Sequence, residues 1–129
     1  MFKESVIIFL ILLLVILGNY ITQKYTVETV NMVSEDLNQL RNKLENEDEK
    51  KENLYDIFNT VNDKWYSRHV VLAYYIEHQE LEKVETGLSG VKGYMDVNEY
   101  SDAIVEIDRI NYMLKHIEHK NAINFENIF

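Results

Sequence analysis

Hydrophobic residues form an unbroken run near the start of the chain and recur at helical spacing afterwards. The stretch from Ser5 to Gln23 is uncharged and contains the run VIIFLILLLVIL over Val6–Leu17. As a helix this stretch rises about 28 Å, close to the roughly 30 Å thickness of a bilayer's hydrocarbon core. A helix that is apolar on every face does not suit the surface of a soluble core. The pattern therefore predicts a transmembrane anchor over residues 1–25.

A cleaved signal peptide is the alternative interpretation of the same segment. Signal peptidase needs small residues in an A-x-A-like pattern. The chain has no alanine before Ala73, and Gly18 is the one small residue close after the apolar run. A retained anchor is therefore favoured, and a lipid-modified cysteine is excluded because the chain has no cysteine.

The side of the membrane on which the rest of the chain lies is harder to predict. Lys3 and Lys24 flank the span on its two sides, so the positive-inside rule is almost balanced. A four-residue tail ahead of a single span is typical of a signal-anchor. We therefore expect a single-pass protein of the cell membrane whose C-terminal domain is extracytoplasmic.

Beyond Thr26, apolar residues recur every three or four positions in four separate segments, as in amphipathic helices. The first stripe has coiled-coil a/d spacing over about two heptads, and nothing separates it from the membrane helix. Its members are Val30, Val33, Leu37, Leu40 and Leu44. The run Glu45–Glu52 then interrupts the pattern, as is typical of a solvated turn or an exposed helix end.

The other three stripes predict three further helices. The second consists of Leu54, Ile57, Phe58, Val61, Trp65, Leu72 and Ile76. The third consists of Leu81, Val84, Leu88, Val91 and Met95. The fourth consists of Tyr100, Ala103, Ile104, Ile107, Asn111, Leu114 and Ile117, and the capping box Asp96-x-x-Glu99 is predicted to open it.

The third segment also contains Gly87, Gly90 and Gly93. Each glycine inside a helix costs roughly 1 kcal/mol relative to alanine. Gly87 flanks the apolar stripe, whereas Gly93 lies on the opposite side of the helix. The three glycines therefore predict local looseness rather than one close-packed seam.

Amphipathic helices bury their stripes against one another. The sequence thus predicts an all-α chain, in which the N-terminal transmembrane helix is followed by an antiparallel up-down bundle of three to four helices. The bundle is predicted to occupy residues 26–129. The closing segment AINFENIF is expected to dock on it, because large apolar side chains are rarely left in water.

The composition excludes several classes of protein. A chain that is 47% hydrophobic and 27% charged is not disordered. Thirteen basic residues against 22 acidic ones give a net charge of −9, which repels nucleic acid. The absence of cysteine excludes disulfides, thiol nucleophiles and thiolate metal sites. No nucleophile arrangement and no phosphate-binding loop occurs, so we predict neither an enzyme nor a cofactor.

Histidine and glutamate residues are the candidates for a metal site. His116 and His119 lie one helical turn apart, and Glu77, His78 and Glu80 could add further ligands. Both His116 and His119 project away from the apolar stripe, however, whereas metal sites in bundles use side chains that face inward. Favourable placement of positive charge at a helix end is the preferred interpretation.

Aromatic and histidine side chains of the second segment allow two interpretations each. His69 lies on the apolar face and is expected to be buried and hydrogen-bonded beside Trp65, whose indole N–H should find a polar partner. The tyrosines either form a recognition surface or pack along the flank of the bundle. The candidate interaction residues are Tyr66, Tyr74, Tyr75, Phe125, Ile128 and Phe129.

Three segments of the chain resemble a known family. They are DKWYSRHVVLAYYIEHQELEKVE (Asp63–Glu85), HIEH (His116–His119) and NIF (Asn127–Phe129). The chain is similar over nearly its whole length to the bacterial domain-of-unknown-function family 4363, small proteins with one N-terminal membrane helix and a helical domain. The resemblance implies an accessory partner of multi-pass membrane proteins, and it carries over no catalytic or binding residue.

Two functions remain open from the sequence. The first is a non-enzymatic interaction or accessory module that binds another membrane or envelope protein, or that self-associates through the Val30–Leu44 stripe. The alternative is an envelope metal-binding or ligand-sensing bundle that uses the His/Glu set.

Overall fold

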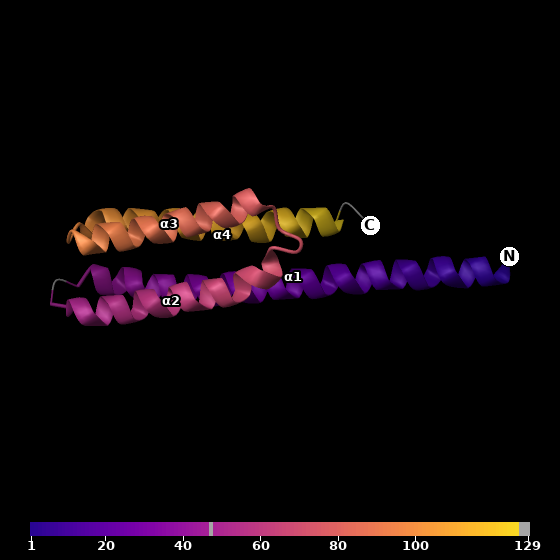
Figure 1. Ribbon diagram of the computed structural model, residues 1–129, viewed down its shortest axis with the longest axis horizontal. Helices are drawn as coiled ribbons and strands as arrows, with labels where there is room; N and C mark the ends of the chain where they lie inside the picture. The colour runs from indigo at the N-terminus through magenta and orange to yellow at the C-terminus, as the bar shows by residue number, and fades with distance from the viewer. Residues whose placement is uncertain (47, 127–129) are drawn as a thin grey trace.

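The computed structural model describes residues 1–46 and 48–126, and for residues 123–126 it describes the backbone alone. Within these residues the chain forms four helices: α1 (Phe2–Leu44), α2 (Lys51–Leu72), α3 (His78–Asp96) and α4 (Tyr100–Glu126). The helices run side by side in one elongated bundle, from which the N-terminal part of α1 projects alone (Figure 1). The predicted all-α fold is confirmed.

The membrane-type segment and the first bundle helix are a single helix, as the sequence indicated. No proline interrupts these 43 residues, and Gly18 is the only glycine among them. The polar side chains of Thr22, Thr26 and Thr29 do not interrupt the helix. Each hydroxyl donates a hydrogen bond to a carbonyl three or four residues earlier in the same helix.

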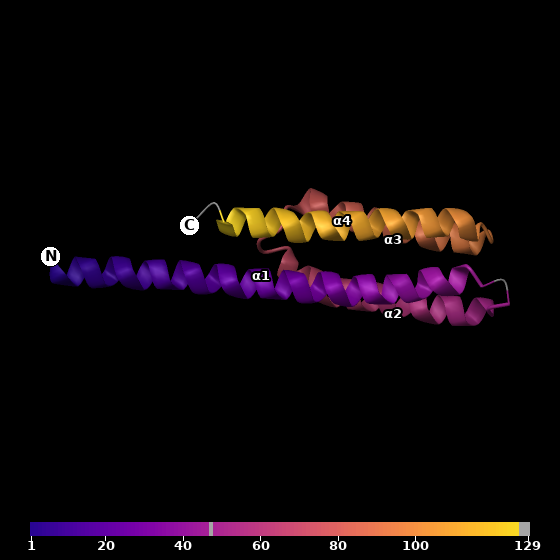
Figure 2. The same cartoon turned by 180° about the vertical axis from the view of Figure 1, so that it is seen from behind.

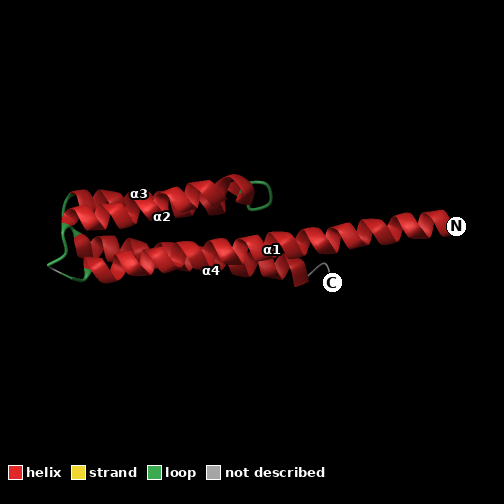
Figure 3. Ribbon diagram, turned by 90° about the horizontal axis from the view of Figure 1, so that it is seen from below, coloured by secondary structure: helices red, strands yellow, loops and turns green. Residues whose placement is uncertain are grey.

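The up-down order of the helices is antiparallel throughout. Along α1 and α4 the contacts run in opposite directions: Asn121 donates to Gln23, Asn111 donates to Asn38, and Arg41 pairs with Asp108. Seen from behind and from below, the helices occupy the four corners of a bundle in which α1 has α2 and α4 as neighbours (Figures 2 and 3). In the described part of the chain, the backbones at opposite corners, α1 with α3 and α2 with α4, do not approach each other closely.

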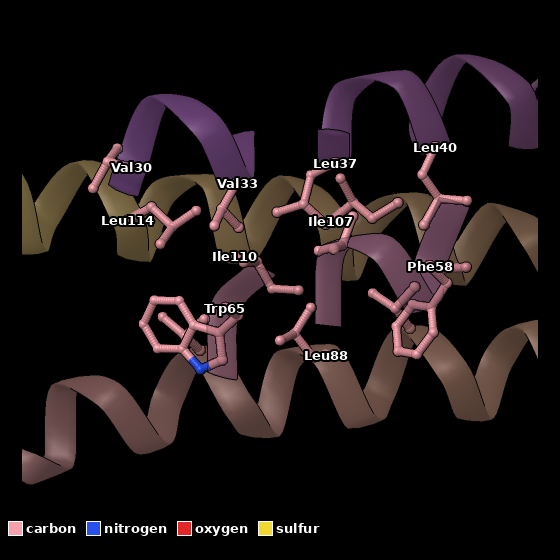
Figure 4. Close-up of a cluster of buried hydrophobic side chains, with 14 of the residues drawn as sticks. Val30, Val33, Leu37, Leu40, Phe58, Trp65, Leu88, Ile107, Ile110 and Leu114 are labelled. Atoms are coloured by element: carbon pink, nitrogen blue, oxygen red, sulfur yellow. The ribbon is translucent and has the colours of Figure 1, made fainter. Parts of the chain in front are cut away.

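The core consists of the apolar stripes that the sequence predicted. In Figure 4, Val33 and Leu37 of α1, Ile107 and Ile110 of α4, and Leu88 of α3 point into the same interior. The five residues of the first stripe are at most 4% exposed, so its coiled-coil spacing serves packing within the chain. The predicted fourth stripe was wrong at Asn111. This residue is half-buried and donates to Asn38, whereas its neighbour Ile110 is fully buried.

The two hairpins α1–α2 and α3–α4 meet differently on the two sides of the bundle. α1 and α4 pack closely, whereas α2 and α3 touch at few points and are bridged by long side chains. Tyr55 of α2 donates to Asp96 of α3, and Lys51 donates to Asn98 just beyond it. The large rings of Phe58 and Trp65 fill the wider space between these helices (Figure 4).

The turn between α3 and α4 corrects the predicted capping box. Asp96 is the last residue of α3, and its carboxylate accepts from Tyr55 and Lys92 instead of capping α4. Asn98 adopts a left-handed conformation with φ of 61°. The Glu99 N–H then bonds to the Tyr94 carbonyl, which together with the Asn98 N–H to Met95 carbonyl bond forms a Schellman motif.

The sequence predicted that the three glycines make α3 locally loose. In the structure, two of the three lie close to side chains of α4. A Cβ atom on Gly87 would lie 2.5 Å from Ile110 Cγ1, and one on Gly90 would lie 3.3 Å from Glu106 Cγ. A Cβ atom on Gly93 would meet nothing within 4 Å. Gly87 therefore permits the close approach of α3 to α4, whereas Gly93 has no packing role.

We predict that Gly87→Ala lowers the stability of the bundle and that Gly93→Ala raises it. Overpacking against the buried Ile110 costs about 1–3 kcal/mol, which outweighs the roughly 1 kcal/mol that alanine gains over glycine in a helix. At Gly93 the added Cβ atom meets nothing, so only the gain in helix propensity changes the stability. Thermal unfolding of the full-length protein in mild detergent, followed by circular dichroism, measures both changes. Equal shifts of Tm in the two variants would contradict the close contact.

Candidate functional site

The N-terminal part of α1 is the largest exposed apolar surface in the described part of the chain. Every residue of Val6–Leu17 is between 41% and 67% exposed, although these residues are all hydrophobic. The helix is long and apolar enough to cross a membrane, and none of its most apolar stretch is buried. From Thr26 onward the same helix packs into the core.

A small polar layer lies where the apolar stretch of α1 enters the bundle. The Tyr75 hydroxyl lies 2.9 Å from Thr26 Oγ1 and donates to the Thr22 carbonyl at 3.2 Å. From α4, Asn121 Nδ2 donates to Gln23 Oε1 at 2.8 Å. This layer joins α1 to the α2–α3 loop (residues 73–77) and to the C-terminal part of α4.

Sequence analysis did not identify this polar layer, although a signal was present. Thr26 lies four residues before Val30, and Asn121 lies four residues after Ile117, so both polar residues continue an apolar stripe. Thr26 is completely buried. Burial raises the pKa of the Tyr75 hydroxyl, and its hydrogen bond with Thr26 acts in the opposite direction.

The three candidate tyrosines differ in their surroundings. Tyr74 is 86% exposed and Tyr66 is 48% exposed, so both present their rings to the outside. Tyr75 instead packs against the core and belongs to the polar layer. The predictions for Phe125, Ile128 and Phe129, and for docking of the closing segment, concern side chains outside the described part of the chain.

The His/Glu set separates into small groups, each with its own partner. His78 pairs with Glu82 on its own helix at 3.0 Å. Glu77 pairs with Lys120 of α4 at 2.9 Å, and this hydrogen bond lowers the pKa of Glu77 and raises that of Lys120. Glu77 and Lys120 thus connect the residue before α3 to α4 at the exposed surface.

Glu80, His116 and His119 complete the set. Glu80 is the one buried carboxylate among the described residues, and His116 Nε2 approaches its Oε2 to 3.7 Å. His119 is exposed. Among the residues that the structure describes, no group of three or more histidine, aspartate or glutamate side chains is arranged to hold a metal ion.

Trp65 and His69 lie beside each other on α2, with ring centroids 6.2 Å apart. Trp65 is completely buried, and no described protein group accepts a hydrogen bond from its indole N–H. Burial of the large ring in the space between α2 and α3 is the main contribution of Trp65 to the core. His69 is partly exposed, with Nε2 3.0 Å from Glu85 of α3.

Comparisons with known proteins give one match. The model of the family described as "Domain of unknown function (DUF4363)" matches residues 20–128. No curated protein and no solved structure matches the chain.

We predict that Tyr75→Phe destabilises the bundle, whereas Tyr74→Phe does not. The first variant removes the hydroxyl that joins the α2–α3 loop to α1, at a cost of about 0.5–1.5 kcal/mol. The second removes an exposed hydroxyl from the adjacent position and should stay within about 0.5 kcal/mol of the wild type. Thermal unfolding of the full-length variants in detergent compares them directly. A Tm for Tyr75→Phe equal to that of Tyr74→Phe would show that the polar layer adds no stability.

Proposed function

The chain belongs to the DUF4363 family, and on that premise we propose that it is a membrane-tethered helical interaction module. In this role the acidic bundle binds another membrane or envelope protein and catalyses no reaction itself. The anchor holds the bundle at the membrane surface, where the partner is concentrated.

The continuity of α1 is the observation that carries this proposal. One half of the helix is core and the other half is exposed hydrocarbon surface, without a break between them. Exposure of so large an apolar surface to water is unfavourable, since each Å² costs about 25 cal/mol. A bilayer removes this cost and leaves the packed half of the helix outside the hydrocarbon.

Retention of the anchor is favoured over cleavage as a signal sequence. The residues after the apolar run are helical, and Thr22 and Gln23 bond to the α2–α3 loop and to α4. A cleavage site in this region would require small residues at defined spacing, which the sequence lacks. We place the bundle on the extracytoplasmic side as part of this proposal.

The outer face of α2 is the surface that we propose for the partner. Tyr66 and Val70, one turn apart, are both large and exposed on a helix whose inner face is fully packed. Tyrosine is enriched at protein interfaces. The Val30–Leu44 stripe lies within the core of the chain itself, so we do not propose it for self-association.

Labelling of single cysteines tests the tether and its orientation. The chain has no cysteine, so Glu52→Cys at the exposed start of α2 gives one reactive site. A membrane-impermeant maleimide should label it in intact spheroplasts, whereas the control Lys3→Cys should react only after permeabilisation. Both full-length variants should stay in the membrane pellet after an alkaline wash. The opposite labelling pattern would overturn the orientation, and release of a shortened, soluble chain would overturn the tether.

Photo-crosslinking tests the partner surface. A benzoylphenylalanine at position 66 should give a discrete larger product in native membranes. The matched control replaces Tyr112, an exposed tyrosine on α4, which does not contact α2. We expect a product at least several-fold weaker from position 112. No product at either position would contradict the proposal, and equal products would contradict the assignment to α2.

A further inference from the structure

The level at which the bundle begins along α1 is fixed by the polar layer. Gln23 is the last residue of the uncharged stretch, and it accepts a hydrogen bond from Asn121 of α4. The preceding residue, Thr22, accepts one from Tyr75 of the α2–α3 loop. The loop and the end of α4 therefore lie beside the residues at which α1 leaves the hydrocarbon, if α1 spans the membrane as proposed.

No flexible spacer separates this end of the bundle from the membrane-type helix. α1 is helical on both sides of the polar layer, so its rise of about 1.5 Å per residue fixes the distance. α4 continues past Asn121 to Glu126, which carries its backbone about 7 Å further toward the N-terminal part of α1. Figures 1 and 2 show this end of α4 extending beyond the α2–α3 loop.

Exposed apolar side chains gather at the same end of the bundle. Tyr74, in the loop, is among the most exposed large side chains, and Val70 lies one turn before it. On α1, Tyr20 and Ile21 are also exposed at this level. Tyrosine is enriched where a membrane protein meets the lipid headgroups, because its ring is apolar and its hydroxyl is polar.

The charged groups at this end are suited to a headgroup layer. Lys24 is exposed, and the guanidinium of Arg68 lies 4.6 Å from the centre of the Tyr25 ring. Glu77, which anionic lipid would repel, is paired with Lys120. Acidic residues such as Glu45, Glu49 and Glu52 lie at the opposite end, where α1 passes into α2.

We infer that this end of the bundle rests on the lipid headgroups, with the Tyr74 ring inserted in the interface of the bilayer that α1 crosses. The inference rests on the proposed tether and goes beyond it. A tether alone allows the bundle to be held in water, whereas here the α2–α3 loop and the end of α4 are membrane-contacting elements. The bundle is thereby fixed in height and orientation on the membrane.

Spin labelling of the full chain in phosphatidylcholine vesicles tests the depth of Tyr74. A nitroxide is attached to a single cysteine in four variants, Tyr74→Cys, Tyr112→Cys, Glu52→Cys and Leu14→Cys, all at exposed positions. Tyr112 is the matched control, since it is an exposed tyrosine on α4 about 13 Å above the Asn121 level. Power saturation with oxygen and with a water-soluble nickel chelate reports the depth of each label.

We expect the nickel accessibility at position 74 to be roughly three-fold or more below that at positions 112 and 52, as for an interfacial side chain. Position 14 should be almost inaccessible to nickel and highly accessible to oxygen. Equal nickel accessibility at 74 and 112, with position 14 in lipid, would overturn the inference and leave the tether intact. Free access of nickel to position 14 would overturn the tether and the inference together.

Discussion

The packing of the second half of α1 against both α2 and α4 is the interaction on which the rest of the structure depends. Because α2 and α3 touch at few points, α1 is what holds its own hairpin partner α2 to α4 of the other hairpin. Residues such as Val33, Leu37 and Leu40 are completely buried, so they cannot leave the core without opening it. The membrane-type segment is the direct continuation of this helix, so it is joined to the bundle without a hinge.

The polar layer fixes how far the α2–α3 loop and α4 are shifted along α1. Besides donating to the Thr22 carbonyl, the buried Thr26 hydroxyl lies within hydrogen-bond distance of Tyr75 and Asn121, and a shift of the helices by one turn would break both contacts. Tyr75 and Asn121 approach Thr26 from two different elements, so a single buried residue aligns the α2–α3 loop and α4 along α1. At the far end, surface pairs such as Arg41 with Asp108 are exposed to solvent and contribute little.

Much of the fold could be predicted because the core follows helical periodicity. All five residues of the third stripe are buried, as are those of the first. The failures concern partners rather than periodicity: Asp96 fits a capping motif locally, but Tyr55 of another helix takes its carboxylate. Likewise, the sequence of α3 alone does not show that Gly87 lies against Ile110 of α4. His116 and His119 were predicted to project away from the α4 stripe, and both are exposed in the structure. The polar layer was missed because its polar residues Thr26 and Asn121 continue apolar stripes.

The range of the family match fits the different demands on the two parts of the chain. It begins at residue 20, so it includes Thr22, Gln23 and the whole described bundle but leaves out the run Val6–Leu17. A lipid-facing span needs apolar side chains of sufficient number, in almost any order. The polar layer and the close contact of Gly87 with Ile110 instead need particular residues at particular positions, because the groups that meet there are tightly packed. The matched range thus contains the contacts that depend on particular residues, whereas the apolar run outside it needs only hydrophobic side chains to be able to span a membrane.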